Sequence, residues 1–274
     1  MILLASQFLG GNWFPLLLQY GTVSNKHFIK TERGITTMAL KFLGRGAGFA
    51  DDHTSAYFNT DNNEIVIIDC PVSSYTRLKH FNLSEYENIY VLITHTHGDH
   101  IGGVGLFVQY AFFVFKKNVT IVAPSSEVAT DIATILNIEG NDPNWYKLVT
   151  TKNIEEKNWF GHCIPTQHSP QLLNKCFGYQ LTIDNKNVVY TGDTSTLKPY
   201  LPYLIDNSIL YVDTSVHYGM IHLKLEDALN DFISLVDKGI KIYLMHLDDV
   251  STAEQMVSDY PNINVVTLAE RPPV

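Results

Sequence analysis

The stretch Tyr90-Val91-Leu92-Ile93-Thr94-His95-Thr96-His97-Gly98-Asp99-His100-Ile101-Gly102-Gly103 decides the fold. Its first residues are apolar and β-branched, and so short a run of this kind predicts a buried strand. Three histidines and one aspartate follow within six positions, and two glycines then open a helix-like run. Because α/β folds bind their ligands at the carboxyl ends of their strands, we expect the chemistry of the protein directly after this strand.

The spacing of these polar residues suits divalent metal ions. Neutral imidazole nitrogens and carboxylate oxygens bind zinc at about 2.0–2.2 Å. His95 and His97 are two residues apart, so on an extended strand end their side chains share one face. Gly98 permits a sharp turn before Asp99 and His100. The two pairs can therefore point at two different metal ions; the alternative is a polar loop with incidental histidines.

The motif His95-Thr96-His97-Gly98-Asp99-His100 resembles the H-x-H-x-D-H signature of the metallo-β-lactamase superfamily, and the resemblance covers roughly residues 38–274. It implies an α/β fold, the four-layer αβ/βα metallo-β-lactamase sandwich. The chain itself favours α/β layers, because strand-like residues 119–124 precede a helix-like run with Ser125 as its N-cap. We expect one hydrolase domain over residues 38–274, after an N-terminal extension (residues 1–37) whose role stays open.

The resemblance implies two metal sites, each with three ligands, and one carboxylate that bridges them. His168 and Asp193 follow β-type runs, and His246 lies at the tip of an apolar strand, in the chain order that the superfamily uses. We expect two divalent ions, zinc first and manganese as the alternative. The implied ligand sets are His95, His97 and His168 for one metal, and Asp99, His100 and His246 for the other, with Asp193 as the bridge.

Three further residues resemble supporting groups of the superfamily. Asp69 ends a buried strand and matches a residue that orients the histidine motif, since metal-bound imidazoles need a partner for their second N–H. Asp213, with His222 six residues ahead of Ala228, resembles the ribonuclease Z-like branch, where the acid and the histidine assist phosphodiester cleavage. A histidine paired to a carboxylate can stay protonated and protonate a leaving oxygen. We expect His222 to open a helix that runs to about Asp237.

The glycine-rich segment Gly44-Arg45-Gly46-Ala47-Gly48 admits two interpretations. A phosphate-cradling loop is one, but no Gly-Lys-Ser/Thr follows it. The superfamily offers the other, because members that resemble ribonuclease Z begin with a Phe-Leu-Gly-x-Gly segment near the metal site.

Composition bears on the substrate. The chain has a formal net charge of −9 over 274 residues and lacks the basic arm with which ribonuclease Z enzymes grip transfer RNA. Such a surface binds large nucleic acids poorly, since affinity for them comes largely from cationic contacts to phosphates. We therefore expect a phosphodiesterase for a small phosphodiester, such as a cyclic nucleotide or short oligonucleotide, with a metal-bridging hydroxide as nucleophile and Asp99 orienting it. The alternatives are a tRNA 3′-processing endoribonuclease, a lactone, thioester or carboxylic ester hydrolase, and a non-catalytic metal-binding scaffold.

Two features bear on the location and assembly of the protein. Residues 1–20 are apolar but interrupted by glycines and a proline, which argues against a membrane span, and they lack the marks of a signal peptide. We expect this stretch to pack on the domain or to contact a second copy in a homodimer, by analogy with relatives. Cys70, Cys163 and Cys176 are widely spaced, which predicts free thiols in a reducing, cytoplasmic compartment.

Overall fold

Short apolar runs separated by turns form two six-stranded sheets in residues 38–270, the part of the chain that this computed structural model describes. In each sheet the strands lie in the order in which they follow one another along the chain. The first sheet contains β1 (Lys41–Gly44), β2 (Ser55–Asn59), β3 (Glu64–Ile68), β4 (Asn88–Leu92), β5 (Val119–Ala123) and β6 (Tyr146–Thr150). The second contains β7 (Phe160–Pro165), β8 (Phe177–Ile183), β9 (Lys186–Tyr190), β10 (Ile209–Asp213), β11 (Lys241–Met245) and β12 (Ile263–Val265).

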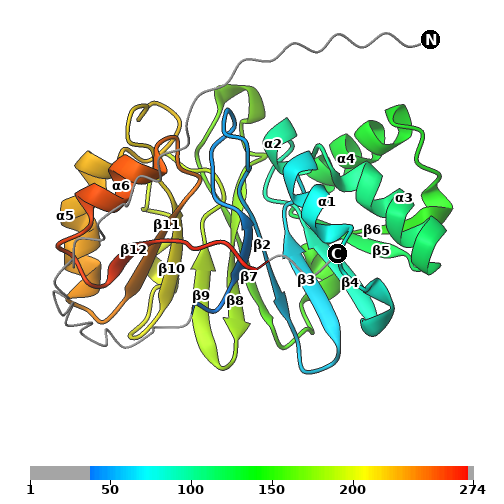
Figure 1. The fold of residues 1–274 in the computed structure, drawn as a ribbon, viewed down its shortest axis with the longest axis horizontal. Helices are drawn as coiled ribbons and strands as arrows, with labels where there is room; N and C mark the ends of the chain where they lie inside the picture. The colour runs from blue at the N-terminus through cyan, green and yellow to red at the C-terminus, as the bar shows by residue number, and fades with distance from the viewer. Residues whose placement is uncertain (1–37, 271–274) are drawn as a thin grey trace, which may run out of the picture. The chain divides into compact units, whose positions relative to one another are not determined.

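Helices cover the outer face of each sheet (Figure 1). The first sheet carries α1 (Val72–Leu78), α3 (Val104–Phe115) and α4 (Ser126–Ile138), and the second carries α5 (Leu225–Val236) and α6 (Val250–Met256). The inner faces share one core, to which Val66 and Leu92 contribute from one sheet and Tyr179 and Tyr211 from the other. The predicted four-layer αβ/βα sandwich is therefore confirmed. The short elements are α2 (Gly98–Ile101), η1 (Leu83–Glu85), η2 (Pro143–Trp145), η3 (Thr151–Ile154), η4 (Pro170–Leu172) and η5 (Leu201–Tyr203).

The direction of the strands determines where the polar residues gather. Strands β3 to β6 run parallel to one another, and so do strands β9 to β12. In each set the carboxyl ends therefore lie at one edge of the sheet. Asp69 follows β3, Asp193 follows β9 and His246 follows β11, while Asp213 is the last residue of β10. Asp69 and His246 have positive φ angles of 59° and 56°, a backbone conformation that is costly without glycine and is common at functional sites.

The helix expected to open at His222 begins later than the sequence predicts, at Leu225. Tertiary pairing accounts for this difference. The Ser215 N–H donates to the carbonyl of Leu223, and the Leu225 N–H donates back to the carbonyl of Ser215, both at 2.9 Å. These two hydrogen bonds hold residues 222–224 in an extended conformation beside Ser215, so His222 lies on a loop.

A tight hairpin joins β8 to β9. Its turn consists of Asp184 and Asn185 alone, with φ angles of 49° and 58° that match a type I′ turn. The aromatic run after the histidine motif forms α3, and Phe113 and Val114 of this helix are exposed. Over residues 38–270, every helix is too short or too polar to cross a bilayer. Residues 1–37, which include the expected dimer contact, lie outside the described residues.

Candidate metal centre

The histidine motif lies where β4 passes into α2. Residues 93–97 connect the two elements, and His97 is the N-cap of the helix with extended backbone angles. This turn buries His95 and His100, whereas His97 and Asp99 stay partly exposed. The end of β4 and the first turn of α2 thus bring four side chains close together, those of His95, His97, Asp99 and His100.

Four side chains form a first cluster. His97 Nδ1 lies 3.0 Å from His95 Nε2 and 3.2 Å from His168 Nε2. Asp193 Oδ2 lies 3.7 Å from His95 Nε2 and 3.5 Å from His168 Nε2. Burial lowers the pKa of His95 well below its usual value and lowers that of His97. Both rings are therefore neutral at physiological pH, as metal ligands must be.

Four side chains also form a second cluster, which shares Asp193 with the first. Asp99 Oδ2 lies 3.4 Å from His100 Nε2 and 3.3 Å from His246 Nε2. Asp193 faces His100 with Oδ1, at 3.3 Å, and His246 with Oδ2, at 3.4 Å. Since its two oxygens reach into both clusters, Asp193 has the position of a bridging carboxylate.

In the second cluster, histidines and carboxylates shift one another's pKa values. Burial works to raise the pKa of Asp193, but His100 and His246 outweigh it and hold this pKa well below its usual value. Burial likewise works to lower the pKa of His100, and Asp193 and Asp69 outweigh it and raise the pKa. Metal ions bind the neutral imidazole, so metal affinity at this cluster should fall in acid.

The donor atoms of both clusters fit divalent cations. His100 Nε2 is buried without a hydrogen-bond partner among the described residues, although it faces the oxygens of Asp99 and Asp193. Such an orphaned polar atom is costly unless something else occupies its lone pair. In each cluster the ligand atoms lie within 4.8 Å of one another, and imidazole with carboxylate suits zinc and also manganese. The residues present thus fit the metal-dependent chemistry that the motif implies.

Outer hydrogen bonds orient the rings of three cluster histidines. Asp69 accepts hydrogen bonds from the Thr94 backbone N–H and hydroxyl and pairs with His100 Nδ1, each at 2.8 Å. The Thr94 hydroxyl also lies 3.0 Å from His95 Nδ1. His168 Nδ1 donates to the carbonyl of Ile221 at 2.9 Å, so its Nε2 keeps a lone pair for the cluster.

Asp213 serves two histidines at once. Its Oδ2 accepts from the Thr194 N–H and pairs with His222 Nδ1, both at 2.8 Å, and its Oδ1 lies 3.3 Å from His246 Nδ1. Asp213, His222 and His246 also lie close enough to form a third group of ligand-type atoms, but these contacts occupy both Asp213 oxygens. Asp213 therefore acts through His222 and His246. Burial works to lower the pKa of His222, but the charge and hydrogen bond of Asp213 outweigh it and raise the pKa.

A cavity of about 780 Å³ opens above the clusters. Side chains from both clusters line it, together with residues 47–50, Ser215, His217, Tyr218, Met220, Ile221, His222 and Asp248. The seven predicted metal ligands thus come together, with Asp69 and Asp213 behind them and His222 beside them. Sequence reasoning missed Thr94, although it lies directly before the motif, and Asp248, two residues after His246. It also missed the exposed Phe49 and Tyr218, whose positions no local pattern indicates.

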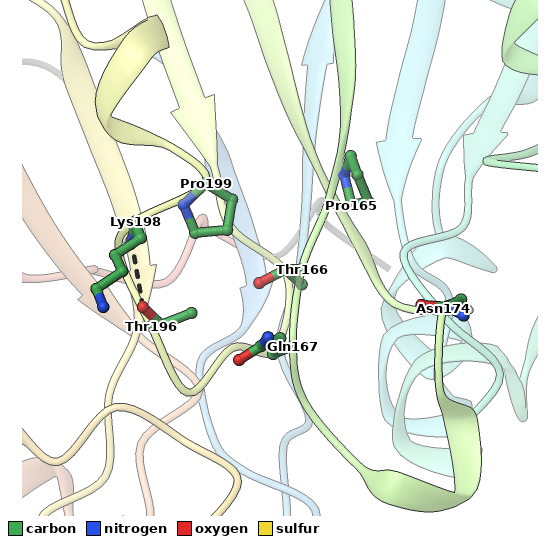
Figure 2. A pocket seen from close by; sticks show the side chains of 7 residues that line it. All are labelled: Pro165, Thr166, Gln167, Asn174, Thr196, Lys198 and Pro199. Carbon is green, nitrogen blue, oxygen red and sulfur yellow. Dashed lines mark hydrogen bonds between the residues drawn. The ribbon is translucent and has the colours of Figure 1, made fainter.

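A second cavity, of about 410 Å³, lies beside the segments that carry His168 and Asp193 (Figure 2). Of the seven residues that line it, Lys198 alone is charged, and Thr196 accepts a hydrogen bond from the Lys198 backbone N–H. No predicted site residue lines it, so the chemistry belongs to the larger cavity.

Comparison with known proteins places this centre in a family. The family model described as Anti-Pycsar protein Apyc1 matches residues 38–267. An Anti-Pycsar protein Apyc1 of Saccharibacillus brassicae is 36% identical over 214 residues, which cover 70% of this chain and 84% of that protein. The chain belongs to the Anti-Pycsar protein Apyc1 family.

More distant relatives share the fold. The Anti-Pycsar protein Apyc1 of Bacillus phage 010DV004 is 26% identical over 236 residues, 78% of this chain and 90% of that protein. The metallo-β-lactamase fold protein YhfI of Bacillus subtilis superposes with a TM-score of 0.66 at 16% identity, covering 84% of this chain and 97% of that one. The predicted superfamily is therefore confirmed, and the chain belongs to the metal-dependent hydrolase superfamily with the metallo-β-lactamase fold.

Proposed function

We propose that the protein is a phosphodiesterase that hydrolyses a small phosphodiester, such as a cyclic nucleotide, with two divalent metal ions, zinc or manganese. The observation that carries this proposal is the 2.8 Å pair between the buried Asp213 and His222, because His222 lines the cavity beside both clusters. An alkoxide that leaves a phosphodiester needs a proton, and a histidine held by a carboxylate can supply it.

The side chains divide the work between them. His95, His97 and His168 would hold one cation, and Asp99, His100 and His246 would hold the other, with Asp193 close to both sets. Two bound cations would lower the pKa of water and offset the charge on the attacked phosphate. Asp99, whose carboxylate is 16% exposed at the cavity, orients the attacking water by accepting its hydrogen bond. His222, fixed through Nδ1 by Asp213, keeps Nε2 for the departing oxygen.

The lining of the cavity favours a small substrate over transfer RNA. None of the described residues that line it is a lysine or an arginine. A chain of phosphates gains its affinity from such cations, so this wall suits a substrate with one phosphodiester. Hydrolysis of a carboxylic ester needs the metal clusters but gains little from His222, because its tetrahedral intermediate is stabilised by the cations themselves.

The test uses the full chain, freed of metal and reconstituted with zinc or manganese. We expect turnover of bis-p-nitrophenyl phosphate and of at least one cyclic nucleotide, and its loss in Asp99→Ala. His222→Gln should lower turnover of the cyclic nucleotide, which releases an alkoxide, by about a hundredfold or more, while p-nitrophenyl acetate, which releases a weakly basic phenolate, is still hydrolysed. His162→Gln, exposed on β7 outside the cavity, is the matched control. Equal loss on both substrates in His222→Gln, or on neither, would refute the assignment.

A further inference from the structure

The proposed reaction uses only part of the large cavity. We call the two metal clusters with His222 its floor, and residues 46–50 and 215–221 its rim loops. Three large side chains of the rim loops face water rather than protein. Phe49 is fully exposed, Met220 is 92% exposed and Tyr218 is 72% exposed, and all three line the cavity. Apolar groups that gather at the mouth of a site are typical of ligand binding.

The first rim loop holds Phe49 at a fixed place beside the floor. The Ala47 N–H donates to the carbonyl of Leu247 at 3.0 Å, which ties the loop to the residue after the ligand His246. Gly48 packs so closely on Asp99 that a Cβ atom there would lie 3.0 Å from its Oδ2. The exposed ring therefore follows directly on a residue in contact with the proposed water-orienting carboxylate.

The second rim loop is held from below by Asp248. This carboxylate accepts hydrogen bonds from the Ser215 hydroxyl at 2.6 Å, the Val216 N–H at 2.7 Å and the His217 N–H at 3.0 Å. The Ser215 hydroxyl in turn accepts from the Tyr218 N–H at 2.7 Å. The backbone under Tyr218 is thus fixed, although its ring faces solvent.

The chemistry of the rim loops indicates what they bind. Their exposed groups are two aromatic rings and a thioether, which bind flat, uncharged surfaces. The titratable groups on the cavity wall are histidines and the carboxylates Asp99, Asp193 and Asp248, so a second phosphate would meet no lysine or arginine there. A nucleobase combines a flat, uncharged face with a tether to a phosphodiester. Stacking on aromatic side chains is tolerant of base identity, because every base has a π-face.

We propose that Phe49 and Tyr218 bind the base of a nucleotide substrate by stacking, with Met220 covering its edge, while the phosphodiester lies on the floor. This inference rests on the proposed phosphodiesterase function and narrows it to nucleotides that carry one phosphodiester charge. The two rings position the substrate and take no part in bond cleavage. They contribute to affinity for the base and leave the proton transfers to Asp99 and His222.

The experiment compares a nucleoside 3′,5′-cyclic monophosphate with a ribose 3′,5′-cyclic phosphate that lacks the base. Phe49→Ala and Tyr218→Ala should each lower kcat/KM for the nucleotide by about tenfold, mainly through KM, as expected for the loss of one stacking partner. Neither variant should change kcat/KM for the abasic substrate. Phe49→Trp should restore the nucleotide activity, and Phe113→Ala, exposed on α3, is the matched control.

Equal losses on both substrates, or no loss on either, would overturn the stacking proposal while the phosphodiesterase function stands. If the wild-type protein cleaves neither substrate, the proposed function fails instead. Equilibrium binding of the cyclic nucleotide to wild-type protein and Phe49→Ala then decides the stacking proposal. Weaker binding to the variant supports it, and equal binding or none to either protein refutes it.

Discussion

The floor and the rim loops of the cavity are built in opposite ways. Floor residues such as His95 and Asp193 lie at strand ends, are buried, and contact one another within 4 Å. Rim residues such as Phe49 and Met220 lie on loops that are fixed through their backbones, while their side chains face water. The comparison suggests that the floor determines which bond is broken and the rim loops determine which molecule is held. Each region can then be changed without the other.

The largest effect should come from emptying the floor. Removal of metal with a chelator should lower diester turnover by more than about a hundredfold, because even residues that only orient metal ligands contribute 10- to 100-fold. Zinc or manganese should restore it, with metal content followed by elemental analysis. The Phe49→Ala and Tyr218→Ala proteins should bind metal as the wild type does. Full turnover in metal-free protein, or metal loss in the rim variants, would contradict the separate roles of the floor and the rim loops.

Substitution of Asp69 or Asp213, which lie behind the floor, should give the next largest effect on turnover. The two variants should differ in how they change diester and ester turnover. Asp69→Asn should weaken metal binding and lower diester and ester turnover together, by about 10- to 100-fold. Asp213→Asn should lower diester turnover further than ester turnover, because Asp213 supports both His246 and His222. Metal titrations with the two substrates separate the cases. Identical substrate profiles for the two variants would contradict the separate role of His222.

A smaller effect should follow from loosening a rim loop. Asp248→Asn weakens charge-assisted hydrogen bonds to residues 215–217, so KM for the cyclic nucleotide should rise by about tenfold or less while metal content stays the same. Chymotrypsin should also cut faster after Tyr218, since the loop that presents this residue opens more often. Unchanged cleavage together with an unchanged KM would show that the loop needs no anchor.

The smallest effect on turnover should come from Glu64, at the other end of the strand that Asp69 follows. Its carboxylate is buried and accepts from Lys157 at 2.8 Å and from Trp159 at 3.1 Å. Glu64→Gln should lower the free energy of unfolding at pH 7 by about 1–3 kcal/mol and leave kcat unchanged. Urea unfolding and steady-state kinetics measure the two quantities, and a change in kcat would show that this end of the sheet is coupled to the floor.

The same carboxylate gives the pH dependence of stability a definite sign. Burial works to raise the pKa of Glu64, but its hydrogen bonds with Lys157 and Trp159 outweigh burial, so the folded-state pKa lies below the ordinary value of 4.5. The stabilisation is therefore complete above pH 4.5 and is lost as the pH falls through the lower folded value. The stability gap between wild type and Glu64→Gln should narrow in acid, and a gap that widens would contradict this account.

The floor could be predicted from the sequence because its residues are tied to local patterns. His95 to His100 follow a short apolar run, and Asp193 and His246 follow others, so strand ends and ligand types coincide. The parallel strands then bring these ends together, as the structure shows. Whether these residues hold metal stays a prediction, and so does the domain boundary at residue 38.

The rim loops could not be predicted, because their geometry depends on contacts between distant segments. Phe49 follows a glycine-rich stretch, and its hydrophobicity alone would assign it to a core; the bond from Ala47 to Leu247 brings its loop to the floor. The wrong helix start at His222 has the same origin. The pairing of Ser215 with Leu223 and Leu225 overrides the local preference, and only the folded chain reveals it.

The hydrogen bond between Ala47 and Leu247 joins residues 200 positions apart and so bears on synthesis at the ribosome. Domains begin to fold from the N-terminus as the chain emerges. Until β11 has left the exit tunnel, however, a nascent chain has neither His246 nor the support for the Phe49 loop. Every translation product that ends before β11 therefore has an incomplete centre.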